Sequence, residues 1–318
     1  MNSFRLPTFL IALLPLMLTG CSRDSRSGER TIGLSVLTMT NPFFKEIGDN
    51  LTEEAAKHGY EVIVVSGEFD PARQDRQVKD FLIRRVEAIV LCPCDSRAIG
   101  QAIKDANVAG IPVFTVDIGC LAPGANVVTH VATDNYSGGK QAAQAMIEAL
   151  GSGGGKVAIL DHKPVESCQL RVKGFKEVIE AHNQKPGSAQ IRIVAELPGG
   201  GVKDQGYKAA EDLLQAHDDL AGIFAINDPS ALGARAALEK AKKAHRIKIV
   251  GFDGQRDGKQ AIKDGKIFAD PIQYPDRIGR EAAQVIARYF KGEETLAEIL
   301  IPTGLYRQAD GLKDPLLK

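Results

Sequence analysis

From Thr31 onward, short apolar runs rich in β-branched residues alternate with longer amphipathic runs. The short runs have the length and composition of strands, and the long runs have the spacing of helices. Continuous apolar strands that alternate with helices are typical of parallel sheets covered by helices on both faces. In the first half of the chain the predicted strands are 31–37, 60–66, 88–92 and 112–116, and the predicted helices are 42–58, 71–84 and 97–108.

A second set of the same kind follows a strand predicted at 127–131. It predicts strands at 155–160, 190–196, 221–225, 246–251 and 267–272, and helices near 135–149, 169–182, 203–216 and 229–243. Because one set suffices for one layered sheet, two sets in succession predict two lobes. The fold class expected from the pattern is therefore α/β, with two similar doubly wound parallel-sheet lobes.

The charge balance limits the kind of partner. The 318 residues include 40 Lys and Arg and 40 Asp and Glu, for a formal net charge of zero. A nucleic-acid partner would favour a basic stripe or patch, so we expect none. The 44% apolar and 25% charged residues are those of a soluble globular protein with ample core.

Residues 1–20 have the pattern of a signal peptide. Arg5 supplies the positive charge, and 9–18 is an apolar run too short to span a bilayer. The segment Leu18-Thr-Gly-Cys21 resembles the lipobox of bacterial lipoproteins, which implies that Cys21 becomes a lipid-modified N-terminus. Residues 21–30 are polar and are predicted to form a tether. An ordinary secretion signal with a chance cysteine is the alternative.

Four further cysteines are predicted to be isolated, buried thiols. They are Cys92, Cys94, Cys120 and Cys168. The Cys92-Pro-Cys94 pair is too close for an unstrained disulfide, and no second C-x-x-C accompanies it to bind zinc. One bridge between Cys120 and Cys168 stays open for an oxidising compartment.

Sequence motifs of catalysis are absent or misplaced. The chain has no G-x-S-x-G and no H-E-x-x-H, and its six histidines lack metal-ligand spacing. The glycine-rich segment 151–156 precedes a predicted strand, whereas a phosphate-binding loop follows one. We therefore expect a protein that is not an enzyme and that uses no cofactor and no metal.

Polar side chains follow the predicted strands at their carboxyl ends, where ligands bind in doubly wound sheets. Carboxylates and amides bridge neighbouring sugar hydroxyls, and an arginine donates to several of them. Two rings, Phe43 and Phe44, stand at a strand-to-helix corner; neighbours on a helix point about 100° apart, so both are not expected to enter one core. Aromatic rings suit the apolar C–H faces of a sugar. The polar residues at strand ends include Asn41, Asp117, Asn227, Asp253 and Gln273.

Six stretches, in order along the chain, make the resemblance specific. From about residue 30 to 306 the chain resembles the type I periplasmic binding proteins of bacterial ABC importers, and within them the ribose-binding branch. The stretches are Thr40-Asn-Pro-Phe-Phe44, Val113-Phe-Thr-Val-Asp117, Arg171-Val-Lys-Gly-Phe175, Phe224-Ala-Ile-Asn-Asp-Pro-Ser-Ala-Leu-Gly233, Val250-Gly-Phe-Asp-Gly254 and Gln273-Tyr-Pro-Asp276. The sugar-binding residues that the resemblance implies are Asn41, Phe43, Phe44, Asp117, Arg171, Asn227, Asp253 and Gln273.

The resemblance also implies how the chain is divided. A hinge of three crossings would separate an N-terminal lobe, 31–132 plus 274–301, from a C-terminal lobe, 133–273 plus 302–318. A monosaccharide or polyol would bind between the lobes of a monomer, and an ABC permease would recognise the closed form. The protein would then sit in the cell envelope, held to a membrane by its lipid. The alternative is a sugar sensor that hands the closed form to a membrane kinase or chemoreceptor.

Each site residue also has a simpler reading. Asn41 and Asn227 could serve only as helix caps, and Gln273 only as a hinge residue. Asp253 could merely shape a turn, while Asp117 and Arg171 could be surface charges. The two aspartates could also form the acid–base pair of a periplasmic sugar enzyme. Catalysis is not needed to explain them, however, because carboxylates that bridge sugar hydroxyls account for both. The lactose-repressor family shares the fold but is rejected, because no basic helical segment precedes Thr31.

Three departures put ribose itself in doubt. Ile118 stands where ribose binders carry a second arginine, Gly201 where they carry a ring, and Leu37 near an expected serine. Tyr207 or Glu166 could refill the space. A different pentose, a hexose, a deoxy sugar and a polyol all stay open, and we expect a ligand other than ribose.

Overall fold

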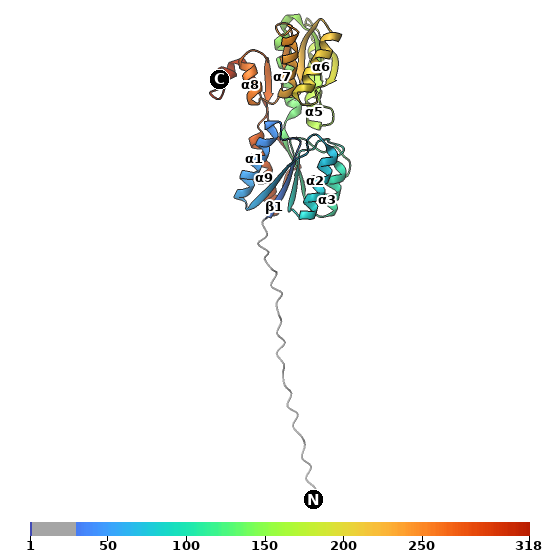
Figure 1. The fold of residues 1–318 in the computed structure, drawn as a ribbon, viewed down its shortest axis with the longest axis vertical. Coiled ribbons are helices and arrows are strands. Elements are labelled where there is room, and N and C mark those ends of the chain that lie inside the picture. The colour runs from blue at the N-terminus through green and yellow to red at the C-terminus, as the bar shows by residue number, and fades with distance from the viewer. Residues whose placement is uncertain (2–29) are drawn as a thin grey trace.

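The computed structural model describes Met1 and residues 30–318. Two α/β lobes stand one above the other, each built around its own sheet (Figure 1). The fold class predicted from the sequence is confirmed. The signal peptide and Cys21 lie outside the described residues.

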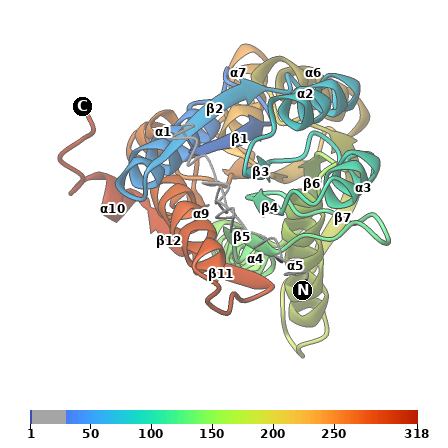
Figure 2. The same cartoon turned by 90° about the horizontal axis from the view of Figure 1, so that it is seen from below.

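The N-terminal lobe contains an entirely parallel sheet of six strands in the order β11-β5-β4-β3-β1-β2. Helices α1 and α9 pack against each other on this lobe, as the view from below also shows (Figure 2). The strands are β1 (Arg30–Val36), β2 (Tyr60–Ser66), β3 (Ala88–Leu91), β4 (Val113–Val116), β5 (Thr129–Thr133) and β11 (Glu298–Ile301). The helices are α1 (Pro42–Lys57), α2 (Pro71–Arg84), α3 (Gly100–Val108) and α9 (Pro275–Phe290).

The C-terminal lobe has a second six-stranded sheet, ordered β12-β10-β9-β8-β6-β7, in which only the edge strand β12 is antiparallel to its neighbour. The strands are β6 (Gly155–Asp161), β7 (Ile191–Pro198), β8 (Leu220–Ala225), β9 (Lys248–Val250), β10 (Ala269–Ile272) and β12 (Gly304–Arg307). The helices are α4 (Asn135–Leu150), α5 (Glu166–Asn183), α6 (Lys203–Ala216), α7 (Asp228–Lys240), α8 (Arg256–Lys263) and α10 (Gln308–Gly311), and a 3₁₀ turn follows α4 at Gly151–Gly153.

The chain passes between the two sheets three times. It leaves the first sheet after β5, returns to that lobe after β10 through α9, and leaves it again between β11 and β12. Residues from separate parts of the chain therefore complete each lobe, and Figure 1 shows segments from late in the chain, in orange, in both lobes.

Three helices begin with the same local signal, an Asx cap followed by a proline in the first turn. The Asn41 side chain accepts the Phe43 N–H, Asp70 accepts the Ala72 N–H, and Asn227 accepts the Ser230 N–H. Proline is favoured there because its missing N–H would have no helical partner. Two of these three helix starts face the region between the lobes, as described below.

Several predicted boundaries were wrong by a few residues; α5, for example, begins at Glu166 instead of 169, and β9 is Lys248–Val250 instead of 246–251. Helix α3 begins at Gly100 instead of residue 97, because the Asp95 carboxylate accepts the N–H groups of Arg97 and Ala98 and holds them in a turn. Strand β5 is Thr129–Thr133 instead of 127–131. The disulfide left open by the sequence is absent, since the four cysteines in the described part, Cys120 and Cys168 among them, are free thiols.

Within the part of the chain that the structure describes, no helix combines the length and the apolar character needed to cross a bilayer.

Candidate functional site

A small cavity lies between the two lobes and is lined by all eight residues that the sequence singled out. The volume of the cavity is about 40 Å³. The eight are Asn41, Phe43, Phe44, Asp117, Arg171, Asn227, Asp253 and Gln273. They come from helix starts, strand ends and one crossing, so the fold brings distant segments to one place.

Arg171 organises the C-terminal side of the cavity. It projects from α5 and is only 3% exposed. Its Nε donates to Asn135 Oδ1 at 2.7 Å, and its Nη1 donates to the Ile226 carbonyl oxygen at 2.6 Å and to Asp253 Oδ1 at 3.1 Å. The guanidinium also lies 3.9 Å from the centre of the Phe252 ring. Arg171 is therefore no surface charge; it is a buried, fixed donor.

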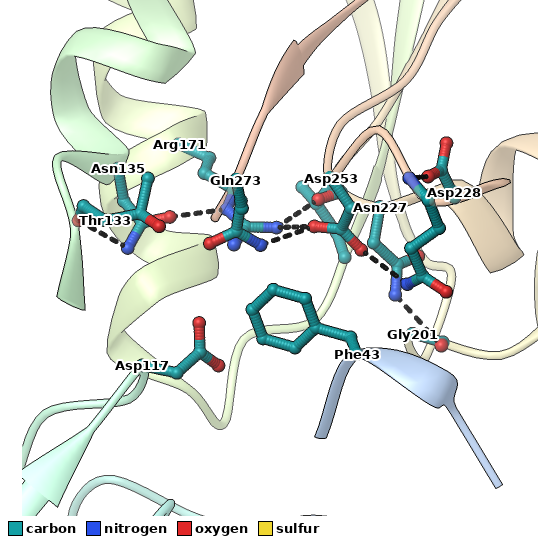
Figure 3. Close-up of polar contacts among 12 residues, drawn as sticks. Phe43, Asp117, Thr133, Asn135, Arg171, Gly201, Asn227, Asp228, Asp253 and Gln273 are labelled. Atoms are coloured by element: carbon teal, nitrogen blue, oxygen red, sulfur yellow. Dashed lines mark hydrogen bonds and ion pairs between the residues drawn. The ribbon is translucent and has the colours of Figure 1, made fainter. Parts of the chain in front are cut away.

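Asp253 accepts hydrogen bonds from three directions. Its Oδ1 also accepts from Gln273 Nε2 at 2.6 Å, and its Oδ2 accepts from Gln255 Nε2 at 3.3 Å (Figure 3). Burial raises its pKa, while Arg171 and Gln273 oppose that effect. Its φ of 103° lies in a region that side chains rarely adopt. Strain of this kind costs roughly 1–3 kcal/mol and tends to persist where function requires it.

Asn41 and Asn227 are helix caps and cavity walls at once. Asn41 Oδ1 accepts the Phe43 N–H at 3.0 Å, and Asn227 Oδ1 accepts the Ser230 N–H at 3.0 Å. The amide nitrogen of Asn227 donates to the Gly201 carbonyl oxygen at 3.0 Å. Capping thus fixes the direction of both side chains, which is useful for a residue that must present polar atoms to a cavity.

The N-terminal side of the cavity is largely apolar. The rings of Phe43 and Phe44 meet edge to face with centroids 5.2 Å apart. They are 3% and 6% exposed and belong to the same core cluster, so the expectation that both would not enter one core was wrong. Because α1 begins at the boundary between the lobes, the hydrophobic core there is continuous with the cavity wall. Phe43 and Phe44 therefore belong to the core and also line the cavity.

Asp117 is the one carboxylate among the cavity-lining residues of the N-terminal lobe. It follows β4 with a φ of 60° and is 3% exposed. Burial raises its pKa to about 7, an effect that Arg171 opposes. The Cys92 thiol lies 3.8 Å from Oδ2, and Oδ1 has no protein partner. Figure 3 shows Asp117 and Phe43 on one side, facing the row of polar groups from the C-terminal lobe.

Three buried polar atoms of the lining residues lack a partner. They are Asp117 Oδ1, Gln273 Oε1 and His162 Nε2. A buried acceptor without a hydrogen bond costs roughly 1–3 kcal/mol, so each is a position where a bound group would gain a bond. The Gln273 oxygen only accepts, and so does Asp117 when it is ionised, which calls for a ligand that donates. Hydroxyl groups meet that requirement.

Phe69 and His162 are among the cavity residues that the sequence missed. Their rings lie 6.1 Å apart and meet edge to face across the two lobes. Both stand just past the carboxyl end of a strand, β2 and β6 respectively, so the same rule that found Asp117 would have found them. Tyr207 and Glu166 do not line the cavity; Tyr207 instead donates to Glu211 along α6.

The lobes also touch directly beside the cavity. The Ser96 N–H donates to the Pro164 carbonyl oxygen at 3.0 Å, and Ser96 Oγ accepts the Glu166 N–H at 2.8 Å. The Gly119 N–H lies 3.4 Å from Glu166 Oε2. These contacts join the N-terminal lobe to the start of α5, so the structure shows the lobes closed on each other.

A metal centre finds no support among the described residues, where no group of three or more His, Cys, Asp and Glu side chains is placed to hold an ion.

Comparisons with known proteins agree with this arrangement. The family described as "Periplasmic binding protein domain" matches residues 32–294. The ribose import binding protein of Salmonella typhimurium is 35% identical over 298 residues, covering 94% of this chain and 96% of that protein. The D-apiose import binding protein of Paraburkholderia graminis is 32% identical over 255 residues, covering 80% of this chain and 79% of that protein.

A solved structure extends the likeness to three dimensions. The Caulobacter myo-inositol binding protein bound to myo-inositol superposes with a TM-score of 0.82 at 25% identity, covering 91% of this chain and 97% of that one. Since the family match and the relatives both span most of the sequence, the chain belongs to the periplasmic binding protein family.

Proposed function

We propose that this protein captures a monosaccharide or polyol between its lobes and delivers it to the permease of an ABC importer. The observation that carries the proposal is the set of unpartnered acceptors, Asp117 Oδ1 and Gln273 Oε1, in a cavity between the lobes that aromatic rings line. Relatives named for ribose and D-apiose import support the same class of ligand.

The proposed roles follow the two sides of the cavity. Arg171 and Asn227 donate to sugar oxygens, while Asp253, Asp117 and Gln273 accept from sugar hydroxyls. Phe43 and Phe44 pack on the C–H faces, and Asn41 presents its amide nitrogen from the start of α1. Because each lobe supplies some of these groups, the ligand binds the closed form best and shifts the protein toward it.

We further propose that the protein only binds and does not catalyse. An acid–base pair needs a carboxyl group free to exchange a proton with substrate. Asp253 is already engaged by Arg171, Gln273 and Gln255, which suits a fixed acceptor better than a proton carrier.

The same proposal places the protein in the cell envelope as a monomer anchored through Cys21. The support is the lipobox-like segment 18–21 and the polar tether that follows it. A lipid-modified cysteine with more than one acyl chain would hold the protein firmly on a membrane. Cys21→Ala should therefore release the protein from the membrane fraction while leaving sugar affinity unchanged. Membrane retention of that variant would remove the anchor from the proposal.

A titration tests the binding function. The mature chain, residues 21–318 without acylation, is screened by thermal shift against pentoses, hexoses, deoxy sugars and polyols, and each hit is titrated by calorimetry. One sugar or polyol binding with a stoichiometry of one is expected. Failure of every sugar and polyol in the set would overturn the function.

A further inference from the structure

A large groove adjoins the sugar cavity. It has a volume of about 930 Å³ and runs between the start of α1 and the crossing at β10 on one side and the starts of α7 and α8 on the other. Six residues line both spaces: Asn41, Phe43, Phe69, Gly201, Asp253 and Gln273. The cavity and the groove are therefore neighbours with a shared wall.

Gly201 is the place where that wall lacks a side chain. A Cβ built there would be in ordinary van der Waals contact, 3.5 Å from Asn227 Nδ2 and 4.0 Å from the Phe69 ring, so the missing side chain leaves a gap the size of one carbon atom between them. The φ of 69° makes this a position that side chains rarely adopt. The hydrogen bond from Asn227 to the Gly201 carbonyl oxygen holds the backbone in this position. The gap is thus built into the fold.

The cavity alone is too small for more than a compact ligand. Its volume is about 40 Å³, against about 930 Å³ for the groove. A second sugar ring therefore finds its room in the groove. Any larger substituent of the ligand has to leave the cavity, and the gap at Gly201 opens toward a groove of ample volume.

The groove carries charges of both signs. Lys203 and Arg256 are exposed on the C-terminal lobe, and Glu46 is exposed on the N-terminal lobe, with Asp276 nearby on α9. Acidic side chains outnumber basic ones among the lining residues, so the groove disfavours an anionic substituent. Its charged and amide groups instead offer hydrogen bonds to hydroxyls.

Building on the function proposed above, we propose that the protein accepts sugars extended by an uncharged glycosyl or alkyl substituent, which leaves the cavity past Gly201 and lies in the groove. The cavity holds one sugar or polyol unit. The groove is a second subsite for the group attached to it.

Matched pairs of probes test the proposal by calorimetry. The parents are ribose, apiose and myo-inositol, and the extended partners are methyl β-D-ribofuranoside, methyl β-D-apiofuranoside and galactinol. At least one parent that binds should have an extended partner with affinity within about threefold of its own or tighter. A loss of more than 100-fold on every extension overturns the second subsite but leaves the function intact; if no parent and no extended probe binds, both fall.

A variant in the groove tests the route of the substituent. Val202 is half-buried, lines the groove but not the cavity, and has an ordinary extended backbone with φ −130°. Val202→Phe should weaken the extended probe at least tenfold and change the parent less than threefold. If Val202→Phe folds poorly, Leu232→Phe in the same groove provides a second variant in which the two affinities are measured.

The matched control is Val194→Phe, which adds the same ring to a half-buried valine on edge strand β7, away from both spaces. It should change neither probe. Equal weakening of parent and extended probe by both groove variants would overturn the route. Tighter binding of ribose 5-phosphate than of methyl β-D-ribofuranoside would overturn the uncharged character of the substituent.

Discussion

The two lobes share a layered architecture, yet they contribute opposite chemistry to the cavity between them. The C-terminal lobe presents a hydrogen-bonded set, Arg171 with Asp253 and the capping amide of Asn227. The N-terminal lobe presents rings and a lone carboxylate, Asp117, with an unpartnered oxygen. The C-terminal half is joined by hydrogen bonds through Arg171, with Gln273 Oε1 and His162 Nε2 left without partners, whereas the N-terminal half offers mainly apolar rings and Asp117. We therefore expect the C-terminal side to determine affinity most strongly and the N-terminal side to tune it.

The largest effect is expected from Arg171→Ala. Removing the guanidinium leaves the Asp253 carboxylate buried without its cation, which costs roughly 3–5 kcal/mol of folding stability and should abolish sugar binding. Arg171→Lys is the matched variant. It keeps the positive charge but loses the planar set of donors, so its folding stability should be closer to that of wild type than its sugar affinity is. Urea unfolding and calorimetry measure the two separately. Wild-type affinity in Arg171→Ala would contradict the dominance of the C-terminal side.

Asp253→Asn should come next, with the fold retained. Asparagine preserves the shape and tolerates the unusual φ, but it gives up the charge and one acceptor. The expected loss is about 2–4 kcal/mol of binding free energy, or roughly 30- to 1,000-fold in affinity. An unchanged melting temperature shows that the site and not the fold is affected. Affinity within threefold of wild type would remove Asp253 from the site.

Asp117→Asn should have a smaller effect that depends on pH. Burial raises the pKa of Asp117 to about 7, so the carboxyl is largely protonated in the free protein below that pH. A sugar hydroxyl that donates to Oδ1 favours the ionised form, so affinity should rise as pH increases from 5 toward 7 and level off above it. In Asp117→Asn this rise should disappear, with affinity about tenfold lower at pH 8. Burial lowers the pKa of the nearby His162, so a rise that persists in the variant would assign it to that group instead.

The smallest effect concerns the direct contact between lobes. Ser96→Ala removes the hydroxyl that accepts the Glu166 N–H, so the closed form loses about 1 kcal/mol and sugar affinity falls roughly fivefold. Since Ser96 does not line the cavity, the association rate of the sugar should change less than its dissociation rate. Stopped-flow binding separates the two. Equal slowing of association would place Ser96 in ligand entry.

Local sequence patterns predicted much of this architecture. Alternating runs predicted the fold class, and the strand-end rule placed Asp117 and Asp253 among the candidate ligand-binding residues. The resemblance added Arg171, which no local pattern on α5 distinguishes from a surface charge. A sequence does not show how deeply a side chain is buried. Phe43 and Phe44 belong both to the hydrophobic core and to the cavity wall, because α1 starts where the core meets the cavity. The gap at Gly201 likewise depends on which groups of the opposite lobe lie beside it.

The central claim is that one ligand contacts both lobes at once. Calorimetric titration of the best sugar into wild type, Asp117→Asn, Asp253→Asn and the double variant at pH 8 tests it most directly. The account predicts that each single variant loses about tenfold or more in affinity, because each removes an acceptor on a different lobe. If either variant binds the sugar within threefold of wild type, the ligand does not depend on that lobe's carboxylate, and the two-sided site is contradicted.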